Sequence, residues 1–400
     1  MSTPSNRWVI LAILFFVRTT MAFQFQAVAA LSPLMMTQFA VGLADIGMLI
    51  GLYLLPGVAI AFPSALLARA LGDRRLVLAG LALMVAGGTW VALGSSWEAQ
   101  LGGRLLAGVG GVIINLILTK LVTDYFTGRE ISTAMAVLVN SWPVGIALAL
   151  VVLPSVAATW NLALAMTLVA AFAAVGLVLL FCFVRETSQS GNGLRPAPLR
   201  ETPLVGMLLS GSVWGLYNAG LPMVFAFGPA LLVEQGYDLE AAASLTSLAL
   251  WALAISIPLG GYLADRSGKR DGVILFSLLG FALLLALAPE WPGSSLILFI
   301  AIGLVGGLAP GPIMSLPSSL LTPRTSASGM GIFFTVFYLD SVLAPIVGGW
   351  LSDQAGTLAA AFYFGAAALV AATLCLLAYR RLEMRTRLDR DDRGSKRPAV

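Results

Sequence analysis

Histidine is absent from this chain of 400 residues, and cysteine occurs only twice. A chain without histidine lacks the commonest metal ligand and the commonest proton shuttle of proteins. Cys182 and Cys375 both lie inside apolar runs and are too few for a disulfide framework or a cysteine-rich metal site. The glycine-rich phosphate loop of ATP-binding proteins is also missing. These absences disfavour a metalloenzyme and an ATP-driven machine, and we expect no cofactor.

Charged residues are also scarce, at 10% of the chain, whereas hydrophobic residues make up 59% and the mean hydropathy is +0.93. A soluble globular protein is about one quarter charged, so this composition indicates a lipid bilayer as the surroundings. A membrane-spanning helix needs about 20 apolar residues. The sequence predicts an all-α membrane protein with twelve such runs: 8–30, 43–68, 76–95, 98–123, 132–154, 160–184, 204–230, 240–263, 272–289, 294–319, 329–351 and 357–379.

One long polar stretch, from Arg185 to Thr202, interrupts the apolar sequence close to its midpoint. Its arginine, proline, glycine and serine residues are typical of a surface linker. It separates six predicted spans from six others. We therefore expect an N-terminal bundle at 1–184, a linker at 185–203, a C-terminal bundle at 204–380 and a basic tail at 381–400. The first run lacks a cleavage site and is predicted to be a retained helix rather than a secretory signal.

The basic residues fall at one end of the predicted helices, and the loops at the other end hold only acids. By the positive-inside rule the basic loops, the linker and both termini are predicted to be cytoplasmic. The net charge of +4 therefore reflects topology, and we expect no nucleic-acid partner. The basic set comprises Arg7, Arg69, Arg74, Arg75, Arg129, Arg185, Arg195, Arg200, Arg266, Lys269, Arg270, Arg324 and the tail from Arg380 to Arg397.

The first span contains Arg18, about eleven residues and so about 16 Å from its cytoplasmic end. A charge at that depth is costly and must face a cavity or a partner. Helical geometry places Phe15, Phe25 and Gln26 on the same face, which predicts an anion-binding wall. The alternative is a permanent pair between Arg18 and an acid or backbone carbonyls.

The fourth span carries a polar stripe that includes Arg104, Asn115 and Thr119. Asn115 is a second candidate for the substrate site, and Arg104 is a candidate second cationic site. Arg104 also lies close enough to the outer end of its helix to extend to the interface instead. Lys120, near the other end, is predicted to be an interfacial anchor.

The seventh span presents Trp214, Tyr217 and Asn218 on one face, about ten residues inside the helix. We predict that they form an aromatic substrate-binding wall opposite Arg18, with an interfacial aromatic belt as the alternative. The eleventh span contains Asp340, the only acid predicted to lie deep in the membrane. Asp340 is the candidate proton-coupling residue, and a permanent pair with Arg18 is its alternative role. The tenth span has so many glycines and prolines that it is predicted to be broken.

The loop after the eighth span carries Gly261, Asp265, Arg266, Gly268 and Arg270 in the order Gly-x-Leu-Ala-Asp-Arg-x-Gly-Lys-Arg. It resembles the signature loop of the major facilitator superfamily of transporters. The resemblance implies two six-helix bundles, one substrate site between them, and an aspartate-based latch at the cytoplasmic gate.

The corresponding loop of the first half departs from that signature, because Ala65 and Arg69 replace the glycine and the aspartate. The two loops still support an internal repeat, since 196 residues separate Gly72 from Gly268. The span entrances around Arg129 and Arg324 give a similar offset of 195 residues.

The opening of the first span, an arginine-bearing helix that runs into an apolar segment ending at Pro33, is similar to the cyanate permease and 2-nitroimidazole transporter branch of that superfamily. From residues and resemblance together we predict a monomeric secondary transporter of a small organic or inorganic anion. We expect transport by symport with protons or by exchange, in the plasma membrane, by resemblance a bacterial inner membrane. The alternative is a proton-antiport exporter of a drug-like or metabolite substrate. An intramembrane enzyme is disfavoured, because Asp340 has no obvious acid partner for general acid/base chemistry.

Overall fold

The computed structural model describes residues 5–41, 43–126, 130–183, 199–237, 239–291, 293–322 and 324–395. Every regular element within these ranges is helical, which confirms the predicted all-α class. Eleven helices in this part of the chain are long and apolar enough to span a membrane, and Met48–Ser64 is a shorter apolar segment. The elements of the first half are α1 (Ser5–Ala30), α2 (Ser32–Phe39), α3 (Leu43–Gly51), α4 (Pro56–Leu71), α5 (Asp73–Leu93), α6 (Trp97–Tyr125), α7 (Ile131–Thr159) and α8 (Leu162–Phe183).

The second half repeats this plan with more interruptions. Its elements are η1 (Leu199–Glu201), α9 (Leu204–Phe225), α10 (Gly228–Glu234), α11 (Leu239–Ser267), α12 (Arg270–Leu287), η2 (Ala288–Glu290), α13 (Ser295–Gly306), α14 (Pro310–Ser315), η3 (Leu316–Ser319), α15 (Ser326–Ala355) and α16 (Ala359–Ser395).

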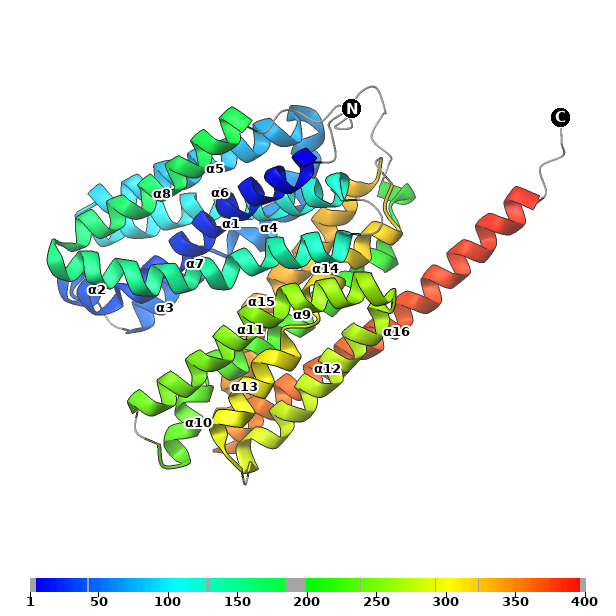
Figure 1. The fold of residues 1–400 in the computed structure, drawn as a ribbon. Helices are drawn as coiled ribbons and strands as arrows, with labels where there is room; N and C mark the ends of the chain where they lie inside the picture. Colours follow the sequence, from blue (N-terminus) through cyan, green and yellow to red (C-terminus); the bar gives the residue numbers. More distant parts are fainter. Residues whose placement is uncertain are drawn as a thin grey trace.

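Several boundaries differ from the prediction. The second predicted span is two helices, since α3 ends at Gly51 and α4 begins at Pro56, a residue suited to a helix start because its missing N–H needs no partner there. The seventh span ends at Phe225 and continues as the separate α10. The predicted tail is not separate either, because α16 runs past residue 380 to Ser395 and projects from the bundle (Figure 1). Most of the predicted linker lies outside the described residues.

The tenth span is broken, as its prolines predict, into α13, α14 and η3. Backbone carbonyls freed by a break need partners, because lipid supplies none. Ser277 donates from Oγ to the Val305 carbonyl at 2.6 Å, and Tyr217 donates from its hydroxyl to the Gly306 carbonyl at 3.0 Å. Side chains of the second half thus supply hydrogen-bond donors to the carbonyls at the break.

The helices form two bundles, seen as the blue-to-green and green-to-red parts of Figure 1. In the first, α1 packs on α7 and α8, and α5 packs on α6 and α8. In the second, α9 packs on α15 and α16, and α11 packs on α13. The bundles meet where α4 contacts α15 and where α7 contacts α11 and α14. The α4–α15 contact and the α7–α11 contact are related by the internal repeat. The second span meets the eleventh in the former, and the fifth span meets the eighth in the latter.

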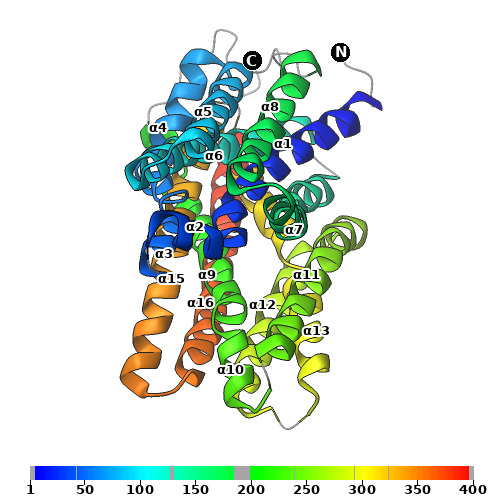
Figure 2. The same cartoon turned by 90° about the vertical axis from the view of Figure 1, so that its left-hand side faces the viewer.

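The contacts between bundles gather toward one end, which we call the basic end because it carries Arg7, Arg74, Arg266 and Arg380. There Ser132 Oγ lies 3.3 Å from Ser315 Oγ. Toward the opposite end, marked by α2, α3 and α10, the two bundles diverge (Figures 1 and 2).

Glycines bring the helices of the two bundles into close contact at the basic end. Gly261 of α11 and Gly311 of α14 both lie against Ala136 and the Ser132 carbonyl of α7, so closely that a side chain at either position would overlap them. The described structure is therefore closed at the basic end and splayed at the other.

Candidate functional site

Arg18 lies in the middle of α1 and is 5% exposed. Its Nε donates to Asn115 Oδ1 at 3.1 Å, and its Nη1 donates to the Leu138 carbonyl at 3.0 Å. Within the described part of the chain, Arg18 forms no ion pair with an acid. Because a guanidinium has five N–H donors, these two bonds leave donors for an anion.

The alternative pairing of Arg18 with Asp340 is absent from this conformation. Asp340 of α15 instead faces α9, where its carboxyl group lies directly against Gly215. Its Oδ2 is buried and has no hydrogen-bond partner among the described residues. A buried carboxylate oxygen without a donor is costly, which marks Asp340 as a residue with a purpose other than holding the fold.

Asn115 joins Arg18 to the second bundle. Its Oδ1 accepts from Arg18, and its Nδ2 donates to the hydroxyl oxygen of Tyr338 at 3.0 Å. Tyr338 is fully buried, and its ring packs on Gly57 of α4. Sequence reasoning missed Tyr338, because one tyrosine in an apolar helix carries no signal of which neighbour it meets.

Phe15 and Gln26, predicted to share the face of Arg18, are both half-buried. No hydrogen bond joins Gln26 to Arg18 in the described structure. Phe25, the third residue predicted for this face, packs on Trp142 and Tyr53, with ring centroids 5.1 and 5.8 Å away.

Arg104 is buried at 3% exposure and serves the backbone. It donates to three carbonyls: from Nε to Leu49 at 3.1 Å, from Nη1 to Gln24 at 2.7 Å and from Nη2 to Phe25 at 2.6 Å. Its guanidinium carbon also lies 4.5 Å from the centroid of the Tyr53 ring, within cation–π range. Arg104 thus ties α1 to the end of α3, beside the break before α4. This geometry favours a structural role over the predicted second cationic site, and Arg104 does not extend to the interface.

The aromatic face of α9 is directed into the second bundle. Trp214 is 4% exposed and stacks on Tyr217 and Phe337, with centroids 5.6 and 5.9 Å away. Tyr217 is 1% exposed and caps the break of the tenth span, so it does not face Arg18. Asn218 is half-buried and donates to the Trp214 carbonyl of its own helix at 2.7 Å. Of the three predicted wall residues, Asn218 is the most exposed.

Lys120 is buried rather than placed as a free interfacial anchor. Its Nζ pairs with Asp73 of α5 and lies 3.5 Å from Asp124 Oδ2 on its own helix. A buried cation between two acids offsets its desolvation through those charges. The cluster lies entirely within the first bundle.

Asp265, in the predicted gate motif, crosses between the bundles. Its Oδ2 accepts from the backbone N–H of Thr133 at 2.7 Å and from the Thr133 hydroxyl at 2.9 Å, at the start of α7. Its Oδ1 accepts from Arg270 at 3.0 Å. The first-turn N–H groups of a helix lack internal partners and attract negative charge. Asp265 therefore caps α7 from the other bundle, which is the geometry of a latch.

The remaining gate-motif residues support the turn around Asp265. Gly268 has a φ of 66°, a left-handed conformation that favours glycine. Gly261 provides the close contact with α7. Arg266 is exposed, with its Nη1 donating to the Tyr262 hydroxyl at 3.0 Å.

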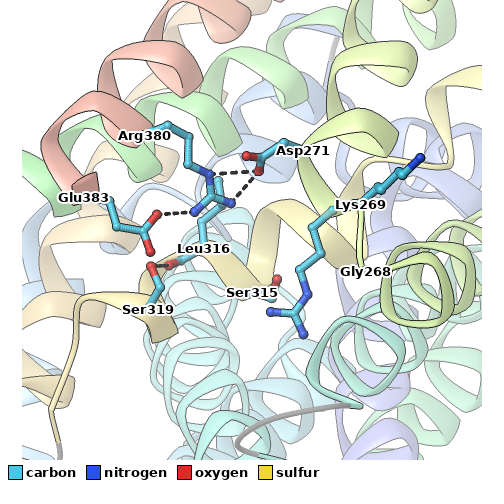
Figure 3. Close-up of a pocket in the computed structure, with 9 residues that line it drawn as sticks. Gly268, Lys269, Asp271, Ser315, Leu316, Ser319, Arg380 and Glu383 are labelled. Atoms are coloured by element: carbon cyan, nitrogen blue, oxygen red, sulfur yellow. Dashed lines mark hydrogen bonds and ion pairs between the residues drawn. The ribbon is translucent and has the colours of Figure 1, made fainter. Parts of the chain in front are cut away.

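A pocket of about 270 Å³ lies beside this turn, between α12, η3 and α16. Figure 3 shows Arg380 held there between Asp271 and Glu383. Arg380 donates to Asp271 Oδ1 from Nε at 2.8 Å and pairs with Glu383 on the next turn of α16. These bonds stay within the second bundle, as those of Lys120 stay within the first.

This sequence and fold are similar to those of known membrane transporters. The sequence profile of the Major Facilitator Superfamily matches residues 14–249 and 204–399. The hexuronate transporter of Bacillus subtilis is 24% identical over 340 residues, which cover 76% of this chain and 79% of that protein. The benzoate transport protein of Acinetobacter baylyi is 33% identical over 138 residues, 33% of this chain and 29% of that protein. The multidrug resistance protein MdtG of Citrobacter koseri is 30% identical over 175 residues, 42% of each chain.

These relatives do not confirm the predicted cyanate and nitroimidazole branch, and the chain spans less than half the length of two of them. Among solved structures, the fold is similar to that of FucP, the E. coli fucose:proton symporter, in its outward conformation, with a TM-score of 0.78. The alignment covers 94% of this chain and 99% of FucP at 14% identity. The human organic anion transporter MFSD10 aligns with a TM-score of 0.73 at 18% identity, over 94% of this chain and 100% of that one.

The family profile spans both bundles, and the helical arrangement matches solved members over nearly the whole chain. The chain belongs to the Major Facilitator Superfamily and is a membrane transporter, not an enzyme.

Proposed function

We propose that this transporter carries a small anion by alternating access, with Arg18 as the counter-charge of the substrate. The observation that carries the proposal is the state of Arg18: it is 5% exposed, lacks an acid partner in the described structure, and has donors left over. An unpaired buried cation is expensive. An anion that binds the guanidinium offsets that cost while it is being carried.

Carboxylates are the first anions to test. A planar guanidinium matches the two oxygens of a carboxylate, which a lysine ammonium does not. Benzoate and hexuronate, which name two of the relatives, are both carboxylates. Asn115 and the half-buried Phe15, Gln26 and Asn218 are the candidate contacts for the rest of the substrate, and Trp214 and Tyr217 support them from behind.

The described state supports the access cycle. The bundles are in contact at the basic end and diverge at the other, an asymmetry that alternating access by rocking bundles requires. The positive-inside rule makes the basic end cytoplasmic, so this is the outward-facing state of a plasma-membrane protein with both termini inside. We take the working unit to be the monomer.

Asp340 is the proposed carrier of a coupled proton. Its Oδ2 is buried without a donor, so a proton on the carboxyl group removes an uncompensated charge. Anion and proton would then bind to different bundles, Arg18 to the first and Asp340 to the second. Their simultaneous occupation neutralises both buried charges before the bundles move.

Export of a drug-like substrate is the second candidate function. The similarity to a multidrug resistance protein favours it, as do the aromatic side chains around α1 and α9. A lone deep cation fits a cationic drug poorly, because like charges would meet in a region of low dielectric constant.

Thermal unfolding in detergent separates these candidates, since a ligand stabilises the state it binds. Benzoate and galacturonate are tested as carboxylates, thiocyanate as an inorganic anion, and ethidium as a cationic dye. We expect a carboxylate to raise the unfolding temperature of the wild type and of Arg74→Gln, a basic-end control. Stabilisation by ethidium without stabilisation by any anion would favour the exporter.

A further inference from the structure

We propose that Tyr338 couples the Arg18 site to closure of the basic end, acting through Asn115 as a positioning residue between the two bundles. The part of this proposal that involves a transported anion rests on the proposed function. The mechanical part is independent of any ligand and can be tested alone.

The link is a chain of three side chains on three helices. Arg18 of α1 donates to Asn115 Oδ1 at 3.1 Å, and Asn115 of α6 donates to the Tyr338 hydroxyl at 3.0 Å. All three are buried, at 5%, 4% and 0% exposure. The guanidinium orients the amide, because the bond to Oδ1 turns Nδ2 toward α15. A buried amide held at both ends has one low-energy orientation.

Tyr338 also makes a steric contact between bundles. Its ring lies over Gly57 of α4, where a side chain would overlap it. The hydroxyl bond and this glycine contact fix α15 against two helices of the first bundle, α4 and α6. When the bundles separate at the basic end, Tyr338 must leave both partners.

The other side-chain hydrogen bonds between the bundles, among the residues that the structure describes, do not involve Arg18. Asp265 caps α7 at Thr133, and Ser132 meets Ser315. These contacts hold the gate shut but give it no direct bond to the candidate substrate site. Within the described residues, the route through Asn115 to Tyr338 is the side-chain hydrogen-bonded connection between Arg18 and the second bundle.

The consequence is a competition at the guanidinium. An anion that binds the free donors of Arg18 pulls the guanidinium toward itself and away from Asn115 Oδ1, so Nδ2 is no longer held toward the Tyr338 hydroxyl. Loss of that bond weakens closure at the basic end. Because coupling between sites is reciprocal, opening of the basic end must also change the affinity for the anion.

A thiol reporter at the seal measures closure without a ligand. In a background of Cys182→Ser and Cys375→Ala, Ser132→Cys places one thiol where the native side chain is fully buried against Ser315. The rate of its reaction with a charged maleimide, measured on the monodisperse protein in detergent, reports opening of the basic end. Tyr338→Phe should raise that rate about fivefold, the factor that matches loss of one hydrogen bond of about 1 kcal/mol.

Thr246→Val is the matched control, because it also removes one buried hydroxyl while keeping the shape of the side chain. The Thr246 hydroxyl donates to the Ala242 carbonyl at 2.9 Å within α11 of the second bundle, far from Ser315. This variant should leave the labelling rate of the reporter thiol unchanged. An equal increase in both variants would overturn the proposal, because it would reflect general loosening.

A double-mutant cycle tests the chain as a unit. Asn115→Leu keeps the side-chain volume but removes the amide, so it should raise the labelling rate as Tyr338→Phe does. The two together should produce no more than one alone, because they break the same link. Multiplied effects would show that Asn115 and Tyr338 act separately, and the proposal would fail.

A final arm adds benzoate at concentrations up to 10 mM, on the order of a weak ligand's range. Benzoate should accelerate labelling in the reporter protein and in Thr246→Val, and should leave the labelling rate of Tyr338→Phe unchanged although the ligand still raises its unfolding temperature. If benzoate accelerated labelling of Tyr338→Phe as much as it accelerates labelling of the reporter protein, the proposed coupling would be wrong. If benzoate neither binds nor is transported while the ligand-free cycle holds, the choice of substrate fails and the link stands.

Discussion

The two bundles follow one plan but hold their charges differently. The first contains three buried cations, Arg18, Arg104 and Lys120. The second contains the half-buried Asp340, whose Oδ2 is buried without a hydrogen-bond partner among the described residues. At the position of Arg18 the second bundle has Trp214, which the repeat offset of 196 residues aligns with it. On the proposed function, this difference divides the work between the two halves: one provides the positive site and the other the titratable acid.

The basic end shows the same division. Asp265 of the second bundle reaches across to cap α7, while Asp73 of the first pairs with Lys120 inside its own bundle. The sequence position that corresponds to Asp265 is Arg69. The latch is therefore one-sided in its chemistry, and the glycines that pack beside it, Gly261 and Gly311, also belong to the second bundle.

The largest effect should come from Arg104→Ala. This change leaves three backbone carbonyls without their donor, each costing about 1–3 kcal/mol when buried. Ile300, the counterpart in the second bundle, is half-buried, so Ile300→Ala should cost far less. Thermal unfolding in detergent compares the two, and similar losses would contradict the structural role assigned to Arg104.

Asp340→Asn should abolish accumulation driven by a pH gradient in liposomes. The amide keeps the shape of the side chain but cannot carry a proton, so the gradient loses its route. Exchange of labelled for unlabelled substrate, which needs no net proton movement, should survive. Accumulation that persists in Asp340→Asn would show that the proton travels elsewhere, and the division between the bundles would then be wrong.

Asp265→Asn should slow transport roughly tenfold, as expected for weakening hydrogen bonds to a charged group worth about 1.5 kcal/mol. Substrate affinity should change less than the rate, because Asp265 does not contact the candidate site and affects it only through closure of the basic end. Asp73→Asn should instead lower the unfolding temperature, since Lys120 loses an acid partner within one bundle. Binding and transport are measured on the same preparations, and the latch assignment fails if affinity falls as steeply as rate.

The smallest effect on transport should come from Trp214→Ala, although loss of this buried side chain should cost about 3–5 kcal/mol of stability. Trp214 packs against Tyr217 and Phe337 and supports the candidate site from inside the second bundle. We expect transport to fall only a few-fold, mainly by loosening α9 against α15. If Trp214→Ala removed binding as completely as a change at Arg18, the aromatic side chain would be a direct substrate contact.

The fold could be predicted because the length and apolar composition of a segment are enough to identify a membrane-spanning helix. Runs of about 20 apolar residues, the central polar stretch and the prolines of the tenth span were sufficient for the class and the broken helix. The short α2 and α10 were not foreseen. Each lies at a loop, where length alone does not distinguish a helix from a turn.

The candidate site was only partly predictable. Depth identified Arg18 and Asp340 as buried ionisable residues, because a rare charge in an apolar run is visible in sequence. Their partners were not, since helical periodicity gives the face of a residue but not which helix lies opposite. Three contacts depend on which helices are neighbours: the bond from Asn115 to Tyr338, the bond from Tyr217 to the Gly306 carbonyl, and the pairing of Lys120 with Asp73.

The most direct test of the account is the binding of labelled benzoate and galacturonate to Arg18→Lys and Arg18→Gln, with Arg74→Gln as the control. Gln removes the charge at Arg18, and Lys keeps the charge but loses the planar fork. The account predicts that binding and uptake are lost in Arg18→Gln, strongly reduced in Arg18→Lys and retained in Arg74→Gln, all on folded protein. A carboxylate bound and transported by the wild type and by Arg18→Gln with equal affinity would contradict it.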